Sequence, residues 1–138
     1  MATRSAIGIL RENGSIEAVY CHWDGYLSGG VGQTLFENYN SFSKVEELVS
    51  YGNISSLGEE IGDKHDFDTR VEGVSTFYKR DRGENGNEAK TFSNKLSFHQ
   101  HYNGSDFYYL YDETKNEWFF KPHDAIEYRS LEEYFIGE

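Results

Sequence analysis

The chain has 138 residues, with 13 Lys and Arg against 24 Asp and Glu, so its formal net charge at pH 7 is −11. This charge argues against nucleic acid as a direct ligand, because neutralisation of phosphates by basic side chains supplies much of the affinity of nucleic-acid-binding proteins. It favours the opposite arrangement, in which an acidic surface binds a basic surface of another protein. An acidic surface that serves only solubility is the simpler alternative.

The length predicts a single domain over residues 1–138 with one hydrophobic core. The 11 Tyr and 10 Phe must supply much of its packing. Cys21 is the lone cysteine and can form no disulfide within the chain, which suits a reducing compartment. No apolar run approaches the ~18 residues of a membrane span, and the first residues lack a secretory-signal pattern. We therefore expect a cytoplasmic protein with no membrane partner.

The first predicted element is a β-hairpin whose strands cover residues 5–11 and 15–23. Asn13-Gly14 lies between the strands, and this dipeptide tolerates the positive φ angles of a two-residue type I′ turn. Such a turn predicts that Ile9 faces Ala18 across the hairpin.

Two short helices are expected next. Apolar side chains recur at helical spacing over residues 31–39. In the second helix, Ser43 is the expected N-cap, because Glu46 follows it at capping-box spacing, and Gly52 is a natural end. Residues 53–72 are polar and glycine-punctuated, and we expect a long loop there. Loops of that length in compact domains are usually functional or disordered.

The remaining elements complete the predicted fold. We expect a strand over residues 74–79, a turn or mobile loop over 81–87, and a helix over 88–102, where the apolar spacing also allows a bent strand. A second hairpin pairs residues 107–111 with 117–121, and Ser130 caps a C-terminal helix. The sum is an α+β fold: an antiparallel sheet of four to five strands, built from the N- and C-terminal hairpins, with short helices mainly on one face.

Two segments carry the side chains that we expect to bind a partner. The corner between the first hairpin and the first helix holds Trp23, Asp24 and Tyr26, and aromatic residues of this kind dominate binding hot spots. Core packing is the alternative role for such rings. The long loop supplies the carboxylates of Asp63, Asp66, Asp68 and Glu72. The corner and these four acids are the predicted partner-binding residues.

A ligand or metal site is the alternative use of the same region. His22, Asp24, His65 and Asp68 are residue types that bind zinc, manganese or iron, although no pair has a defined ligand spacing. Arg80 can grip a phosphate or carboxylate, but the neighbouring Asp81 favours local ion pairing.

A nucleophile and its base are not evident in the sequence. Cys21 and His22 are neighbours on a strand, where their side chains point to opposite faces. We therefore assign no catalytic residue, no metal ligand and no cofactor, and we expect a protein that is not an enzyme.

Several segments resemble a family of small phage and prophage proteins. Residues 19–26 read VYCHWDGY, residues 44–58 read KVEELVSYGNISSLG, and the later segments are HDFD at 65–68 and YKRDRGE at 78–84. The likeness covers most of the chain. The function of the family is largely unassigned, so the resemblance supplies no catalytic residues. It implies a mobile-element origin and expression inside a bacterial host. Small acidic phage proteins of that kind are often inhibitors of host defence, including anti-CRISPR proteins.

Charge, motifs and resemblance together favour a non-enzymatic protein that inhibits a host defence nuclease, such as a CRISPR effector. Its acidic surface would occupy the basic nucleic-acid-binding groove of that nuclease. Two alternatives stay open: a small metal-dependent hydrolase or ligand-sequestering protein that uses His22, Asp24, His65 and Asp68, and a structural or assembly protein of a phage particle.

Overall fold

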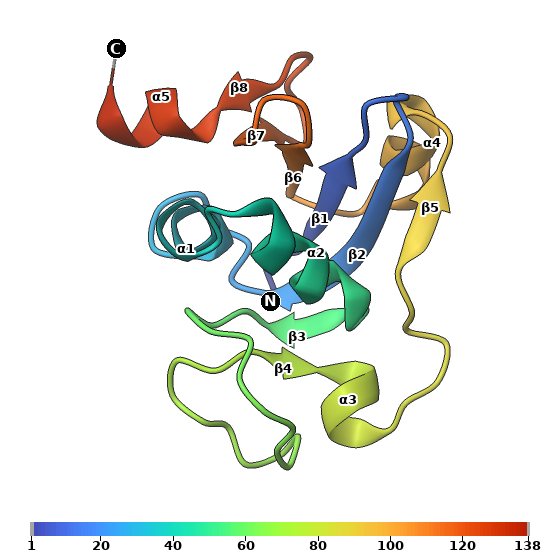
Figure 1. The fold of residues 1–138 in the computed structure, drawn as a ribbon, viewed down its shortest axis with the longest axis vertical. Coiled ribbons are helices and arrows are strands. Elements are labelled where there is room, and N and C mark those ends of the chain that lie inside the picture. The colour runs from blue at the N-terminus through green and yellow to red at the C-terminus, as the bar shows by residue number, and fades with distance from the viewer. Residues whose placement is uncertain (1, 138) are drawn as a thin grey trace.

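A computed structural model describes residues 2–137 of the chain. The strands in this range form one mixed sheet in the order β4-β3-β2-β1-β6-β7-β8, and β5 also pairs with β2. Figure 1 shows the arrangement. In chain order the elements are β1 (Ser5–Leu10), β2 (Ile16–Trp23), α1 (Val31–Asn38), α2 (Phe42–Ser50), β3 (Ile54–Ser56), β4 (Thr76–Phe77), α3 (Tyr78–Arg82), β5 (Lys90–Phe92), α4 (Lys95–His101), β6 (Phe107–Asp112), β7 (Glu117–Pro122), β8 (Arg129–Ser130) and α5 (Leu131–Ile136).

The mixture of helices and strands is confirmed, but the sheet is larger than the expected four to five strands and is not purely antiparallel. Both predicted hairpins are present, as β1–β2 and β6–β7. Parallel pairing of β1 with β6 joins them, and β3 adds in parallel to β2. The additional strands β3, β5 and β8 have only two or three residues each. Segments this short leave no alternating pattern, so the sequence did not reveal them.

The β1–β2 hairpin has a three-residue loop instead of the expected two-residue turn. The Arg11 N–H donates to the Ser15 carbonyl oxygen at 2.8 Å, and the Gly14 N–H donates to the Arg11 carbonyl oxygen at 2.9 Å. Gly14 has a φ of +92°. This is a type I turn followed by a residue with positive φ, the usual form of three-residue hairpin loops. Ile9 therefore lies opposite Glu17, and not opposite Ala18 as predicted.

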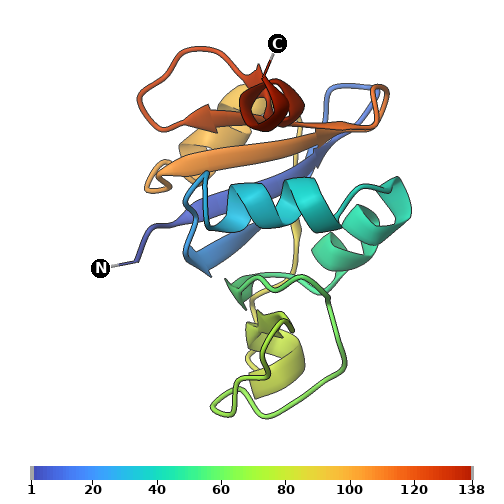
Figure 2. The ribbon, with the colours of Figure 1, turned by 90° about the vertical axis from the view of Figure 1, so that its left-hand side faces the viewer.

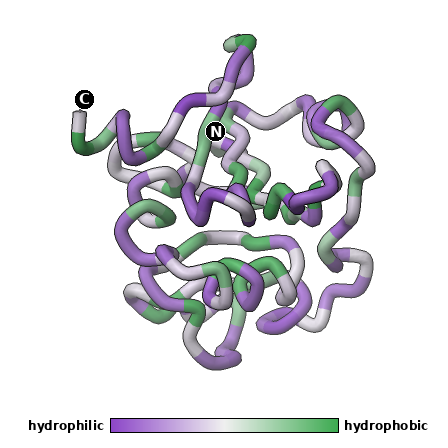
Figure 3. The backbone as a smooth tube through the Cα atoms, turned by 45° about the horizontal axis from the view of Figure 1, so that its top comes forward, coloured by the Kyte–Doolittle hydropathy of each residue, from purple (hydrophilic) through white to green (hydrophobic). Residues whose placement is uncertain are grey.

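The two faces of the sheet are covered by different helices. One face carries Ile7, Ile9 and Tyr109 in a large core cluster to which α1, α2 and α5 contribute. The opposite face carries a smaller cluster around Ala18, which includes Phe98 of α4. Figure 2 shows α1 in front of the strands and α4 behind them, and in Figure 3 many of the outer connections are hydrophilic. Helices α1, α2 and α5 therefore cover one face of the sheet, and α4 covers the other.

Helix α2 occurs where predicted but begins earlier than expected. Its N-cap is Ser41, whose hydroxyl accepts a hydrogen bond from the Lys44 N–H at 3.3 Å. The expected N-cap, Ser43, lies inside the helix. The apolar stripe of Val45 and Leu48 is buried as predicted. The C-terminal helix α5 begins directly after Ser130, whose hydroxyl caps it as expected.

The middle of the chain differs most from the prediction. The strand expected over residues 74–79 is reduced to Thr76–Phe77, and α3 follows at once. The expected helix over residues 88–102 divides into β5 and the shorter α4, which Asn94 caps by accepting a hydrogen bond from the Ser97 N–H. Within the described range, no helix combines the length and apolar character needed to cross a bilayer.

Candidate functional site

The corner after β2 presents two aromatic rings to solvent. Trp23 is 41% exposed and Tyr26 is 49% exposed, and Asp24 between them is exposed as well. Exposed aromatic rings beside a carboxylate can contribute both apolar area and charge to a binding surface.

Hydrogen bonds to the backbone hold this corner in place. The Val31 N–H, at the start of α1, donates to the Asp24 carbonyl oxygen at 2.8 Å and closes the turn. The hydroxyl of the buried Tyr109 donates to the Gly25 carbonyl oxygen at 2.8 Å. The first N–H group of α1 is therefore already hydrogen-bonded within the turn. The second hydrogen bond attaches the corner to the core residue Tyr109.

His22 and Cys21 point away from each other on β2. The Nδ1 atom of His22 lies 2.7 Å from the Tyr20 hydroxyl, and burial, together with the charge of Arg4, lowers the pKa of His22. Cys21 is fully buried, and burial raises the pKa of its thiol to about 12. A buried, protonated thiol is a poor nucleophile.

The segment between β3 and β4 is an exposed acidic loop. Its cations are Lys64 and Arg70. Its carboxylates are all exposed, and none forms a salt bridge with another residue of the described range: Glu59, Glu60, Asp63, Asp66, Asp68 and Glu72. We call residues 57–75 the acidic loop. Its charge is therefore displayed to solvent and not neutralised by the rest of the fold.

The acidic loop is supported from inside by Asp81. The Asp81 side chain is 0% exposed. Its carboxylate accepts hydrogen bonds from the His65 N–H at 3.0 Å, the Phe77 N–H at 2.8 Å and the Arg80 Nε at 3.0 Å. Burial by itself raises the pKa of the Asp81 carboxyl, but these donors outweigh burial and hold the pKa below its ordinary value. Sequence reasoning placed Asp81 in a turn and so missed this buried anchor.

Arg80 and His65 complete the support of the loop. The guanidinium of Arg80 donates to the carbonyl oxygens of Ile61 at 3.1 Å, Gly62 at 2.8 Å and Ser75 at 3.0 Å. The Nε2 atom of His65 lies 3.2 Å from the Ser75 carbonyl oxygen, and its Nδ1 atom lies 3.0 Å from that of Asp66. The expected local ion pair of Arg80 with Asp81 is confirmed.

The corner and the acidic loop lie side by side, although the sequence separates them by more than thirty residues. Parallel pairing of β2 with β3 places Trp23 opposite Ser56, directly before the loop. The guanidinium of Arg70, which lies in the acidic loop, donates to the hydroxyls of Ser55 at 3.0 Å and Ser56 at 2.6 Å on β3. Figures 1 and 2 both show the loop at the end of the molecule opposite the β6–β7 hairpin.

The residues of the predicted alternative site have separate surroundings. His22 contacts Tyr20 on β2, whereas His65 and Arg80 face the inner side of the acidic loop. Asp24 and Asp68 are exposed. In residues 2–137, no group of three or more His, Cys, Asp or Glu side chains is arranged to hold a metal ion. Both ring nitrogens of His65 already contact backbone oxygens, so this histidine is poorly placed to bind one.

Comparison with known proteins finds no matching family model, and no curated protein or solved structure is significantly similar to the chain.

Proposed function

We propose that this protein is a non-enzymatic inhibitor of a host defence nuclease, with a CRISPR effector as the first candidate. The acidic loop would occupy the basic groove in which the nuclease holds nucleic acid, and Trp23 and Tyr26 would anchor the contact beside it. The resemblance to phage and prophage proteins motivates the choice of partner, and the bacterial cytoplasm would be the site of action.

The observation that carries the proposal is the unneutralised charge of the acidic loop next to exposed rings. Six exposed carboxylates without a salt-bridge partner in the described range stand against two cations. Fields of this kind steer association with an oppositely charged surface and add to its specificity. The neighbouring rings of Trp23 and Tyr26 supply the apolar area that charge alone lacks.

The anchoring of the loop supports the proposal further. Asp81 and Arg80 bind its backbone at several points, and Phe67 packs on the inside with its ring centroid 5.5 Å from that of Tyr78. A loop that is already ordered loses less conformational entropy on binding than a flexible one. This support also weakens the hydrolase alternative, because His65 and Arg80 use their polar groups within the fold.

The test is inhibition of DNA cleavage by a panel of purified, guide-loaded CRISPR effector nucleases. We expect micromolar protein to inhibit at least one effector, and inhibition to weaken as salt is raised. The variant carries four neutralising substitutions in the acidic loop: Asp63→Asn, Asp66→Asn, Asp68→Asn and Glu72→Gln. It should bind that effector at least about fourfold more weakly, since each charge pair at a rim contributes roughly 0.2–1 kcal/mol and four pairs together contribute roughly 0.8–4 kcal/mol.

A matched control separates this surface from net charge in general. It removes four exposed carboxylates near the C-terminus: Asp124→Asn, Glu127→Gln, Glu132→Gln and Glu133→Gln. The control should inhibit nearly as well as the unchanged protein. Equal losses in both variants would show that only total charge matters, and no complex with any effector at micromolar protein would refute the proposed function. Binding of the protein to the DNA substrate itself would also contradict it.

A further inference from the structure

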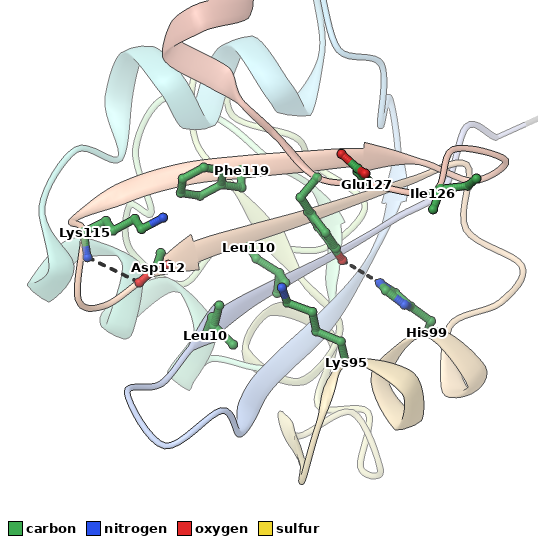
Figure 4. Close-up of a pocket in the computed structure, with 10 residues that line it drawn as sticks. Leu10, Lys95, His99, Leu110, Asp112, Lys115, Phe119, Ile126 and Glu127 are labelled. Atoms are coloured by element: carbon green, nitrogen blue, oxygen red, sulfur yellow. Dashed lines mark hydrogen bonds between the residues drawn. The ribbon is translucent and has the colours of Figure 1, made fainter.

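The face of the sheet behind α1 and α2 is only partly covered and contains a groove of about 440 Å³. Its floor consists of Leu10, Leu110 and Phe119, which come from three neighbouring strands. Helix α4 borders the groove on one side, and the segment before β8 borders it on the other (Figure 4). Ile126 lies on its rim and is 93% exposed. The volume is in the range of ~300–1,000 Å³ that is usual for small-molecule sites.

Two ammonium groups face this apolar floor. In Figure 4 the Lys95 side chain extends from α4 toward Leu110, and its Nζ atom lies 5.2 Å from the Tyr128 ring centroid. The Nζ atom of Lys115 lies 5.2 Å from the Phe119 ring centroid. Neither lysine has a salt-bridge partner in the described part of the chain. By contrast, Arg11, Lys79, Arg80 and Arg82 all pair with carboxylates.

Two carboxylates also line the groove, and neither neutralises a lysine directly. The Oδ1 atom of Asp112 accepts hydrogen bonds from the Thr114 N–H at 3.0 Å, the Thr114 hydroxyl at 2.7 Å and the Lys115 N–H at 3.3 Å. The Asp112 carboxylate therefore stabilises the β6–β7 turn. Glu127 is exposed, and no ion pair within residues 2–137 includes it.

An uncharged polar pair closes one end of the groove. The Nε2 atom of His99 lies 2.6 Å from the Tyr128 hydroxyl, and the two rings stack with centroids 5.7 Å apart. Burial, with the charges of Lys121 and Lys95, lowers the pKa of His99, and burial raises the pKa of Tyr128. Both groups are neutral at pH 7, so the wall offers hydrogen bonding without adding charge.

We propose that this groove binds a small amphipathic organic anion, a carboxylate or sulfonate on an aromatic or acyl body. The apolar body would lie on Leu10, Leu110 and Phe119, where it would also cover Ile126. Lys95 and Lys115 would supply the positive charge that favours its anionic group. The site is independent of the acidic loop, because it lies at the opposite end of β1 and β2, beside the hairpin loop that follows Leu10.

The test uses two fluorescent dyes that share an arylamine-naphthalene body. The dye 8-anilinonaphthalene-1-sulfonate carries the anion, and N-phenyl-1-naphthylamine is neutral. We expect saturable binding of the sulfonate dye at one site. Lys95→Gln and Lys115→Gln should each weaken it about two- to fivefold and leave binding of the neutral dye unchanged, as expected for loss of one exposed charge pair. Phe119→Ala should weaken binding of both dyes, because it removes part of the floor.

Lys90→Gln is the matched control, since Lys90 is exposed on β5, outside the groove. Thermal melts by circular dichroism establish that each variant is folded. The proposal is overturned if the sulfonate dye shows no saturable binding, or if Lys95→Gln and Lys115→Gln bind it as the unchanged protein does. Equal losses for both dyes in the lysine variants would also overturn it, because the groove would then not distinguish an anion.

Discussion

Replacing Asp81 with Asn should release the acidic loop from its inner support. Asn is nearly the same size but keeps only one carbonyl oxygen, and its amide nitrogen would face N–H donors. The carboxylate accepts four hydrogen bonds, two on each oxygen, from His65, Phe77 and twice from Arg80. Loss of two bonds to a charged acceptor, at about 1.5 kcal/mol each, predicts a loss of about 3 kcal/mol. That agrees with the ~3–5 kcal/mol found when a buried ion pair loses one partner.

Two measurements check this prediction. Urea denaturation at pH 7 reports the free energy of unfolding, and amide hydrogen exchange reports local release. The N–H groups of His65 and Phe67 are the probes, because they donate to the side chain and the backbone carbonyl of Asp81 respectively. The control is Glu84→Gln, which breaks the ion pair of Glu84 with Arg82 on the surface, where the two side chains are 44% and 48% exposed. That change should have little effect on the free energy of unfolding.

The effect of Asp81→Asn should also depend on pH. Because the pKa of Asp81 is lower in the folded protein than in the unfolded chain, the stabilisation by its carboxylate is present in full above the unfolded value of about 3.9. It is lost as the pH falls through the folded pKa. The stability difference between the unchanged protein and the variant should therefore be constant from about pH 5 to 7 and shrink below about pH 4. A difference between about pH 5 and 7 that is no larger than that of Glu84→Gln would refute the role assigned to Asp81.

The remaining predictions concern backbone conformation and capping, and urea denaturation measures each. Gly52→Ala should destabilise by at least about 2 kcal/mol, since Gly52 has a φ of +86° and an added Cβ would lie 2.2 Å from the Asn87 carbonyl oxygen. Gly14→Ala, at a φ of +92° but in open space, should lose only about 1 kcal/mol, and equal losses would contradict the steric argument. Ser41→Ala should lose about 1 kcal/mol because it removes the N-cap of α2. Ser43→Ala should change little, and the reverse order would place the start of the helix at the sequence-based position.

Features that depend on near neighbours in the chain were predictable. The β6–β7 hairpin, the buried stripe of α2 and the cap at Ser130 follow from alternation, helical spacing and a serine before an apolar run. The wrong predictions arose where two local signals competed. Ser41 and Ser43 both precede the apolar stripe of α2. The helix is capped by Ser41, although only Ser43 has a glutamate at capping-box spacing. Asn13-Gly14 fits two turn types, and they differ in register by one residue.

Features that depend on distant contacts were beyond local patterns. Strand β3 is only Ile54–Ser56, and it is a strand because the edge of β2 is beside it. Asp81 lies among charged residues in the sequence, yet it is buried because Arg80 and two backbone N–H groups surround it. The acidic loop was recognised from composition, whereas the groove was not, since its floor draws one residue from each of three separate strands.

The parallel pairing of β1 with β6 has a consequence for biosynthesis. It joins Ser5 to Phe107 and Leu10 to Asp112, so the central strand of the sheet gains its second neighbour only when more than three quarters of the chain has been translated. Until then, the nascent polypeptide exposes an unpaired strand edge next to Ile7 and Ile9. Proteins whose contacts span such separations fold slowly, because a long loop must close before the contacts form. The β1–β2 hairpin should therefore emerge early from the ribosome, before β6 is available to pair with it. During that interval it is the segment most exposed to aggregation.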